Sequence, residues 1–114
     1  MHLGELAQQV SQTSSDPVVQ GLAKLLRDWQ SDDSSVEKLR DSVERYVGNS
    51  WIESNEEHER IYSLWSKFRD EAVEPIGGMT MNERLYWFDL LAHFDDCDTD
   101  DARARIYSKL LASP

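Results

Sequence analysis

The chain has 114 residues, a length that suits one domain, and we expect residues 1–114 to fold as a single unit. It carries 12 Lys and Arg against 22 Asp and Glu, which gives a formal net charge of −10. Because 39% of the residues are hydrophobic, a wholly disordered chain is excluded. The single cysteine, Cys97, excludes an internal disulfide framework and a cysteine-rich zinc site.

The charge and hydropathy patterns also argue against two classes of partner. No stretch of the chain is basic, so binding to the phosphate backbone of a nucleic acid is disfavoured. The longest unbroken apolar run, residues 85–88, is far too short to span a bilayer, and the first residues do not resemble a secretory signal. We therefore expect a cytoplasmic protein that contacts neither nucleic acid nor membrane.

Helical periodicity begins near the N-terminus. Leu3, Leu6 and Val10 predict a short first helix with a thin apolar stripe, so residues 1–15 are expected to pack loosely. Asp16 and Pro17 form a helix-start signal, because the aspartate can cap the helix and proline is tolerated at its first position. The helix that follows should end at the polar linker 31–34.

Two further helices are predicted in the middle of the chain by Ser-x-x-Glu capping boxes. Ser34 with Glu37 should start one helix, which Gly48 would end in a left-handed conformation. A second box, Ser50 with Glu53, should start a long helix from residue 51 to about 74, which the segment 75–78 then breaks.

The last third of the chain carries two more helix starts. Thr80 with Glu83 should open a helix over 81–94, and Thr99 should cap a final helix. No segment alternates polar and apolar residues as a strand does. The sequence therefore predicts an all-α, compact, up-and-down bundle of five to six helices with no sheet.

The 81–94 segment is apolar around most of its circumference, so it must be covered on nearly every side. Either it is the central helix, forming most of the core together with the second half of the 51–74 helix, or one face meets another chain. We favour the central position and keep a homodimer through this segment, or through the N-terminal helix, as the alternative.

Carboxylates crowd the expected start of the fourth helix, and they supply the candidate partner-binding site. A helix dipole gains only about 0.3–1 kcal/mol from each well-placed charge, so this many acids leaves room for a contact surface. Trp51 beside them matches an interface hot spot, an aromatic anchor with a charged rim. The candidate residues are Trp51, Glu53, Glu56, Glu57 and Glu59, together with Asp32 and Asp33.

Other polar groups are weaker candidates. Asp96, Asp98 and Asp100 have calcium-loop spacing, but Asp101 and Tyr107 stand where glycine and glutamate are required, and we expect no metal site. His58 is expected at the edge of the core. Asp89 and His93, four residues apart, can pair on one helix face, and these three residues could line an inter-helix pocket.

These observations favour a small, non-catalytic protein-interaction module without a cofactor. An inhibitor or immunity-type protein that binds a basic partner would have this size and charge. The alternatives are a self-associating helical protein and, as a third class, a small-molecule binder or enzyme with a pocket between helices.

Overall fold

The structure is a computed structural model that describes residues 1–113, and every regular element in that range is helical. The four long helices are α1 (Leu3–Thr13), α2 (Pro17–Ser31), α3 (Val36–Asn49) and α4 (Asn55–Phe68). A π-helical turn (Arg69–Val73) and a 3₁₀ turn (Glu74–Gly78) continue α4, and the short helices α5 (Met81–Trp87), α6 (Leu91–Asp95) and α7 (Asp100–Lys109) follow. The all-α class is confirmed, but residues 1–113 hold seven α-helices rather than five or six.

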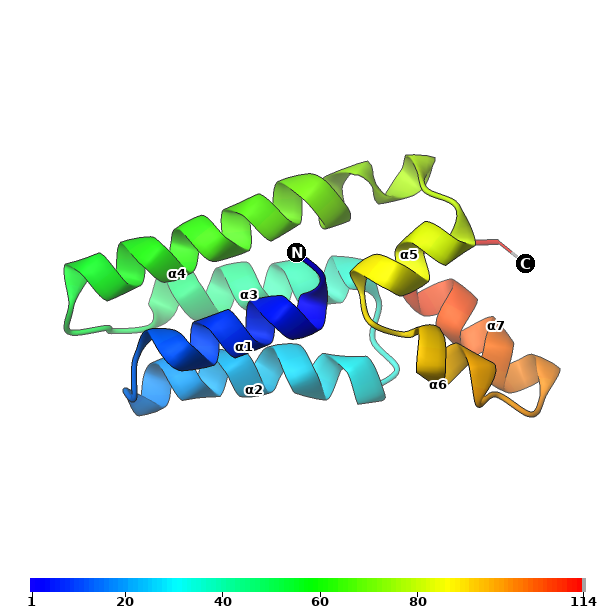
Figure 1. Ribbon diagram of the computed structural model, residues 1–114, viewed down its shortest axis with the longest axis horizontal. Helices are drawn as coiled ribbons and strands as arrows, with labels where there is room; N and C mark the ends of the chain where they lie inside the picture. The colour runs from blue at the N-terminus through cyan, green and yellow to red at the C-terminus, as the bar shows by residue number, and fades with distance from the viewer. Residues whose placement is uncertain (114) are drawn as a thin grey trace.

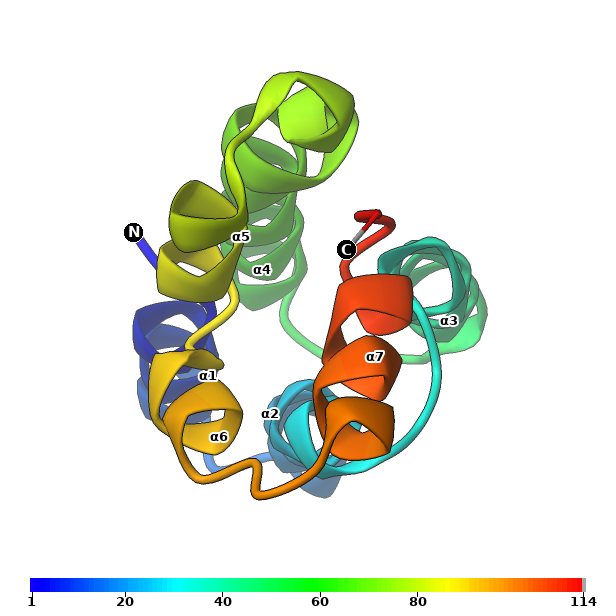
Figure 2. The same ribbon diagram turned by 90° about the vertical axis from the view of Figure 1, so that its right-hand side faces the viewer.

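The long helices lie side by side along the long axis of the molecule, and the short ones gather at one end (Figure 1). α1 packs on α2 and on α4, and α2 packs on α3, so the four helices form a row in the order α4, α1, α2, α3. Figure 2, which looks along the long helices, shows this row curling around with α5, α6 and α7 in front of it. None of the helices in the described residues is both long enough and apolar enough to cross a membrane.

Several helix starts follow the local signals in the sequence. The side chain of Asp16 accepts a hydrogen bond from the backbone of Val18, with Pro17 at the first position of α2. Thr80 and Glu83 form a reciprocal capping box at α5, and Thr99 caps α7 through the backbone of Ala102. These caps satisfy backbone N–H groups that a helix start leaves free.

Three predicted helix boundaries are wrong. Ser35 rather than Ser34 caps α3, and Ser54 rather than Ser50 caps α4, so Trp51 lies in the preceding loop. Two Ser-x-x-Glu boxes stand in tandem there, and the second is used because buried Ile52 holds the loop against the core. Gly48 lies inside α3 and is not left-handed.

The core differs from the prediction in where its residues come from. Most of the buried apolar residues lie on α1, α2, α3 and α4, whereas the 81–94 segment contributes Leu85, Phe88 and Leu90. The others are Ile52, Ala72, Val73, Ile76 and Leu110. Residues 1–15 are not loosely packed, since Leu3, Leu6, Ala7 and Val10 are each at most 1% exposed. A short apolar stripe is enough because α1 lies between α2 and α4.

The continuous 81–94 helix is also wrong. The segment breaks into α5 and α6 at residues 88–90, where Asp89 adopts a left-handed φ of 53°. It lies at the end of the long helices rather than at the centre of the bundle (Figure 1), and Tyr86 and Leu91 are exposed.

Candidate functional site

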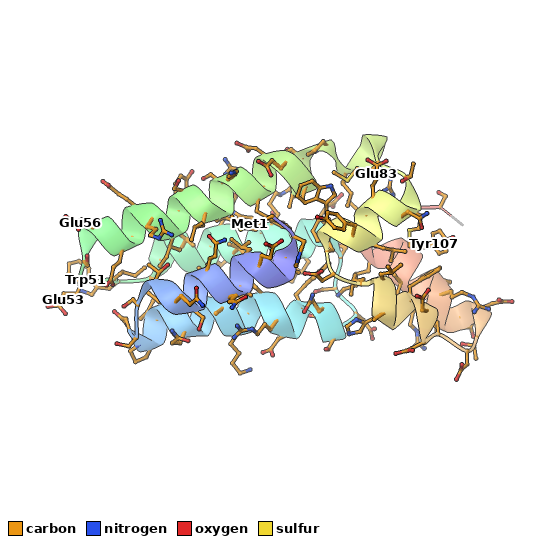
Figure 3. The ribbon with its side chains drawn as sticks, viewed as in Figure 1. Met1, Trp51, Glu53, Glu56, Glu83 and Tyr107 are labelled. Carbon is orange, nitrogen blue, oxygen red and sulfur yellow. The ribbon has the colours of Figure 1, made fainter. Side chains whose placement is uncertain are left out.

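Two loops meet at the end of the molecule opposite α5–α7: the turn between α1 and α2, and the loop between α3 and α4. Trp51 stands on the second loop with 83% of its side chain exposed, the largest exposed fraction of any large apolar residue described. Figure 3 shows it beside Glu53 and Glu56 at the tip of the molecule. We call this surface, made of Asp16, Trp51, Glu53, Glu56 and Glu57, the acidic end.

The carboxylates of the acidic end are not engaged in ion pairs. The two segments that form it, residues 10–23 and 46–57, contain no Lys or Arg. None of its four carboxylates takes part in an ion pair among the described residues. Between the loops lies an open hollow of about 540 Å³, with Asp16, Glu53 and Glu57 among its lining residues. The surface therefore offers an apolar ring and anionic oxygens to a partner.

Helix capping accounts for part of this cluster. Asp16 caps α2, and Glu56 and Glu57 occupy the first turn of α4, where the helix dipole favours negative charge. Glu53 and Trp51 lie outside any helix, so neither contributes to a cap or to the first turn of a helix. The sequence had marked Asp16 only as a cap, because its proximity to Glu53 depends on the tertiary fold.

The remaining predicted partner residues are not all on this surface. Glu59 is exposed one turn further along α4. Asp32 and Asp33 lie in the α2–α3 loop, at the other end of the long helices (Figure 1). The carboxylate of Asp32 is engaged by Lys109, so it is not a free part of a contact surface.

Lys109 forms a buried anchor that the sequence did not suggest. Its side chain is only 5% exposed, and its Nζ donates to the backbone oxygens of Trp29, Asp32 and Ser34 and to Oδ1 of Asp32. The ammonium also lies 3.8 Å from the centre of the Trp29 ring. Burial lowers the pKa of Lys109, while the hydrogen bond and charge of Asp32 oppose that shift. Lys109 thereby ties α7 to the end of α2.

His58 lies half-buried on α4, as expected, and it lines a groove of about 360 Å³ between α3 and α4. Tyr62, Trp65 and Arg69 line the same groove from α4 and its continuation. Hydrogen bonding with Tyr62, and then with Glu44 and Asp70, raises the pKa of Arg69 above its usual range. The guanidinium is thus fixed by its neighbours, 3.1 Å from Glu44 and 3.2 Å from Asp70.

The structure does not bring Asp89 and His93 together as predicted. Because the helix breaks at Asp89, its carboxylate turns to the start of α1, where it accepts from the backbone of Gly4 at 2.5 Å and contacts the ring of His2. His93 instead lines a small groove that includes Asp32, Asp33 and Lys109. Within residues 1–113, no three His, Cys, Asp or Glu side chains are grouped so that they could hold a metal ion.

Comparisons of the chain with family models, with curated proteins and with solved structures find no match.

Proposed function

We propose that this chain is a non-catalytic interaction module that binds a basic protein partner in the cytoplasm through its acidic end. The observation that carries the proposal is Trp51, 83% exposed at the tip of the molecule among unpaired carboxylates. A large exposed aromatic side chain costs free energy in water and gains it when a partner covers it.

The charge at the acidic end defines the partner. Four carboxylates that form no ion pair among the described residues produce a negative potential, and the net charge of −10 adds to it at long range. A partner surface rich in Lys and Arg would be steered toward this end and would meet Trp51 there, since cations also favour the face of an indole ring. An inhibitor that covers a basic region of an enzyme is one form that this function would take.

The test is quantitative capture of partners from cells that express the protein. Full-length wild type, Trp51→Ala and the triple variant E53Q/E56Q/E57Q are immobilised, and bound proteins are compared by mass spectrometry. The matched control is D95N/D96N/D98N, which also removes three negative charges, but from exposed positions at the other end of the molecule. We expect a basic partner to be kept by wild type and by the control and lost from the other two variants.

With that partner purified, Trp51→Ala should weaken binding by about 30-fold or more, as the loss of a hot-spot residue does. Binding by wild type should weaken as salt increases, and that salt dependence should be smaller in E53Q/E56Q/E57Q. The proposal is wrong if the control triple variant loses the partner equally, or if the affinity is insensitive to both salt and Trp51.

A further inference from the structure

The ring of His2, at the start of α1, contacts two carboxylates at once. Its Nε2 lies 2.8 Å from Oε1 of Glu5 in the same helix, and its Nδ1 contacts Oδ2 of Asp89 at the break between α5 and α6. The start of α1 lies beside α5 in both views of the ribbon (Figures 1 and 2). His2 therefore connects two parts of the chain that are 87 residues apart in the sequence.

The hydrogen bonds around the ring indicate how many protons it carries. Oδ2 of Asp89 also accepts from the backbone N–H of Gly4 at 2.5 Å, and Oε1 of Glu5 also accepts from the backbone N–H of His2 at 3.3 Å. Since both oxygens already act as acceptors, the pattern is complete when each ring nitrogen donates to one of them. A neutral imidazole has a single N–H, whereas an imidazolium donates from both nitrogens. The arrangement therefore requires the protonated ring.

The charges around the ring also favour the imidazolium. Glu5 and Asp89 bring two negative charges into direct contact with it, and charge-assisted hydrogen bonds are about twice as strong as neutral ones. The dipole of α1 opposes a cation at this end of the helix, but its effect is smaller than that of the two contacts. Tyr86 of α5 lies edge-on to the ring, with 5.9 Å between the centroids, and the amino group of Met1 pairs with Glu71 at 3.8 Å.

Gly4 provides the space that the contact with Asp89 requires. A Cβ added to Gly4 would come within 2.6 Å of Oδ2 of Asp89, so the carboxylate would have to move. Gly4 lies in the first turn of α1, although glycine is a poor helix former. Asp89 reaches this place from a left-handed backbone with a φ of 53°. Both residues depart from the local preference of the backbone, and both departures allow the same contact.

We propose that His2, Glu5 and Asp89 form a proton-dependent latch that fastens the break between α5 and α6 to the start of α1. When the imidazolium releases a proton to water, one ring nitrogen presents a lone pair to a carboxylate, and that contact becomes repulsive. The break is then held less tightly against α1. Histidine changes its charge between about pH 5 and 8, so the latch responds to changes in pH near neutrality. It is independent of the acidic end and of any partner.

The first test follows the latch by NMR on the full-length protein, with no residues added before Met1. The backbone amide proton of Gly4 reports the contact, because it donates to Asp89. We expect its signal to move upfield between about pH 5.5 and 8, with the same midpoint as the ring signals of His2. The movement should be absent in His2→Gln and much smaller in Asp89→Asn. A Gly4 signal that does not follow His2, or that moves as far in Asp89→Asn as in wild type, overturns the proposal.

The second test compares the Tm of wild type and His2→Gln at two pH values. Because the imidazolium holds the latch, its stabilisation is present at the acidic end of the range and is lost as the pH rises. We expect His2→Gln to lower Tm by about 4 °C or more at about pH 5.5, and by less than half of that at about pH 8.

His93→Gln is the matched control for this comparison. His93 is exposed and takes part in no ion pair among the described residues. The difference in Tm between His93→Gln and wild type should therefore be the same at both pH values. If His2→Gln and His93→Gln show the same dependence on pH, the latch does not exist.

Two glycine substitutions test whether the space at Gly4 serves the latch. Gly4→Ala should displace the carboxylate of Asp89 and lower Tm at about pH 5.5, although alanine is the better helix former. Added to Gly4→Ala, His2→Gln should have the same effect at both pH values. Gly48→Ala is the control, because Gly48 also lies in a helix but a Cβ there meets no atom within 4 Å, so it should not lower Tm. A Gly4→Ala variant that is at least as stable as wild type at both pH values contradicts the proposal.

Discussion

At the scale of single residues, Lys109 shows how a charge can be buried when its partners are arranged around it. The last carbonyls of α2 have no partners inside their own helix, and a cation at that end is favoured by the helix dipole. Lys109 arrives from α7 and donates to the backbone oxygens of Trp29, Asp32 and Ser34. Burial lowers the pKa of the amine, and the hydrogen bond and charge of Asp32 oppose only part of that shift.

Lys109→Met keeps the length of the side chain and removes the ammonium. We expect it to lower the free energy of unfolding by about 2–4 kcal/mol, because one buried and three partly buried oxygens lose the ammonium donor. The measurement is urea denaturation followed by circular dichroism. Lys24→Met is the control: Lys24 also pairs with an aspartate, Asp28, but both side chains are mostly exposed, so a change of less than about 0.5 kcal/mol is expected. Equal effects of the two substitutions would show that Lys109 is not an anchor.

At the scale of elements, the break between α5 and α6 depends on a contact with a distant part of the chain. Asp89 is left-handed, a conformation that costs a residue with a side chain about 1 kcal/mol or more and that aspartate tolerates better than most. Its carboxylate accepts from the backbone of Gly4 and faces His2 at the start of α1. The amide of Gln30 supports the same corner by donating to the backbone oxygen of Phe88.

A series of substitutions at Asp89 separates these two contributions. Asp89→Asn keeps an oxygen acceptor and tolerates the left-handed backbone, so it should cost least. Asp89→Gly removes the acceptor but relieves the backbone, and Asp89→Ala loses both, with an expected cost of about 2 kcal/mol or more. Chemical denaturation of the three variants should give the order Asn, Gly, Ala. If Ala is the least destabilising, the helix prefers to continue through residue 89 and the contact with α1 contributes little.

The helix starts that the sequence predicts correctly depend on local contacts, whereas the break between α5 and α6 does not. The starts of α2, α5 and α7 are set by short-range caps, Asp16, Thr80 and Thr99, and were predicted correctly. The break at Asp89 requires a partner 85 residues away, which no local pattern contains. In the candidate site, the exposed Trp51 was singled out from the sequence, whereas its neighbour Asp16 and the groove at Trp65 depend on how the helices pack.

At the scale of the whole molecule, the exposed apolar residues are divided between distant places. The molecule measures 46 × 25 × 21 Å, with Trp51 at the tip of the long helices and Tyr86 and Leu91 on the short helices at the other end. The N-terminal helix, which was a candidate dimer face, has its apolar residues buried against α2 and α4. Two copies of a chain with a net charge of −10 also repel each other.

We therefore expect the purified protein to be a monomer of 13.2 kDa at micromolar concentration. Tyr86, Leu91 and Leu111 are single exposed side chains, and together they offer much less than the roughly 800 Å² per partner that stable interfaces bury. Sedimentation equilibrium at low and at moderate salt checks this, because salt screens the repulsion between copies and would reveal a weak dimer. A dimer that Leu91→Glu dissociates and Trp51→Ala does not would establish self-association through the short helices. In that case the chain would be better described as a self-associating helical protein, and its main contact surface would be the short helices, not the acidic end.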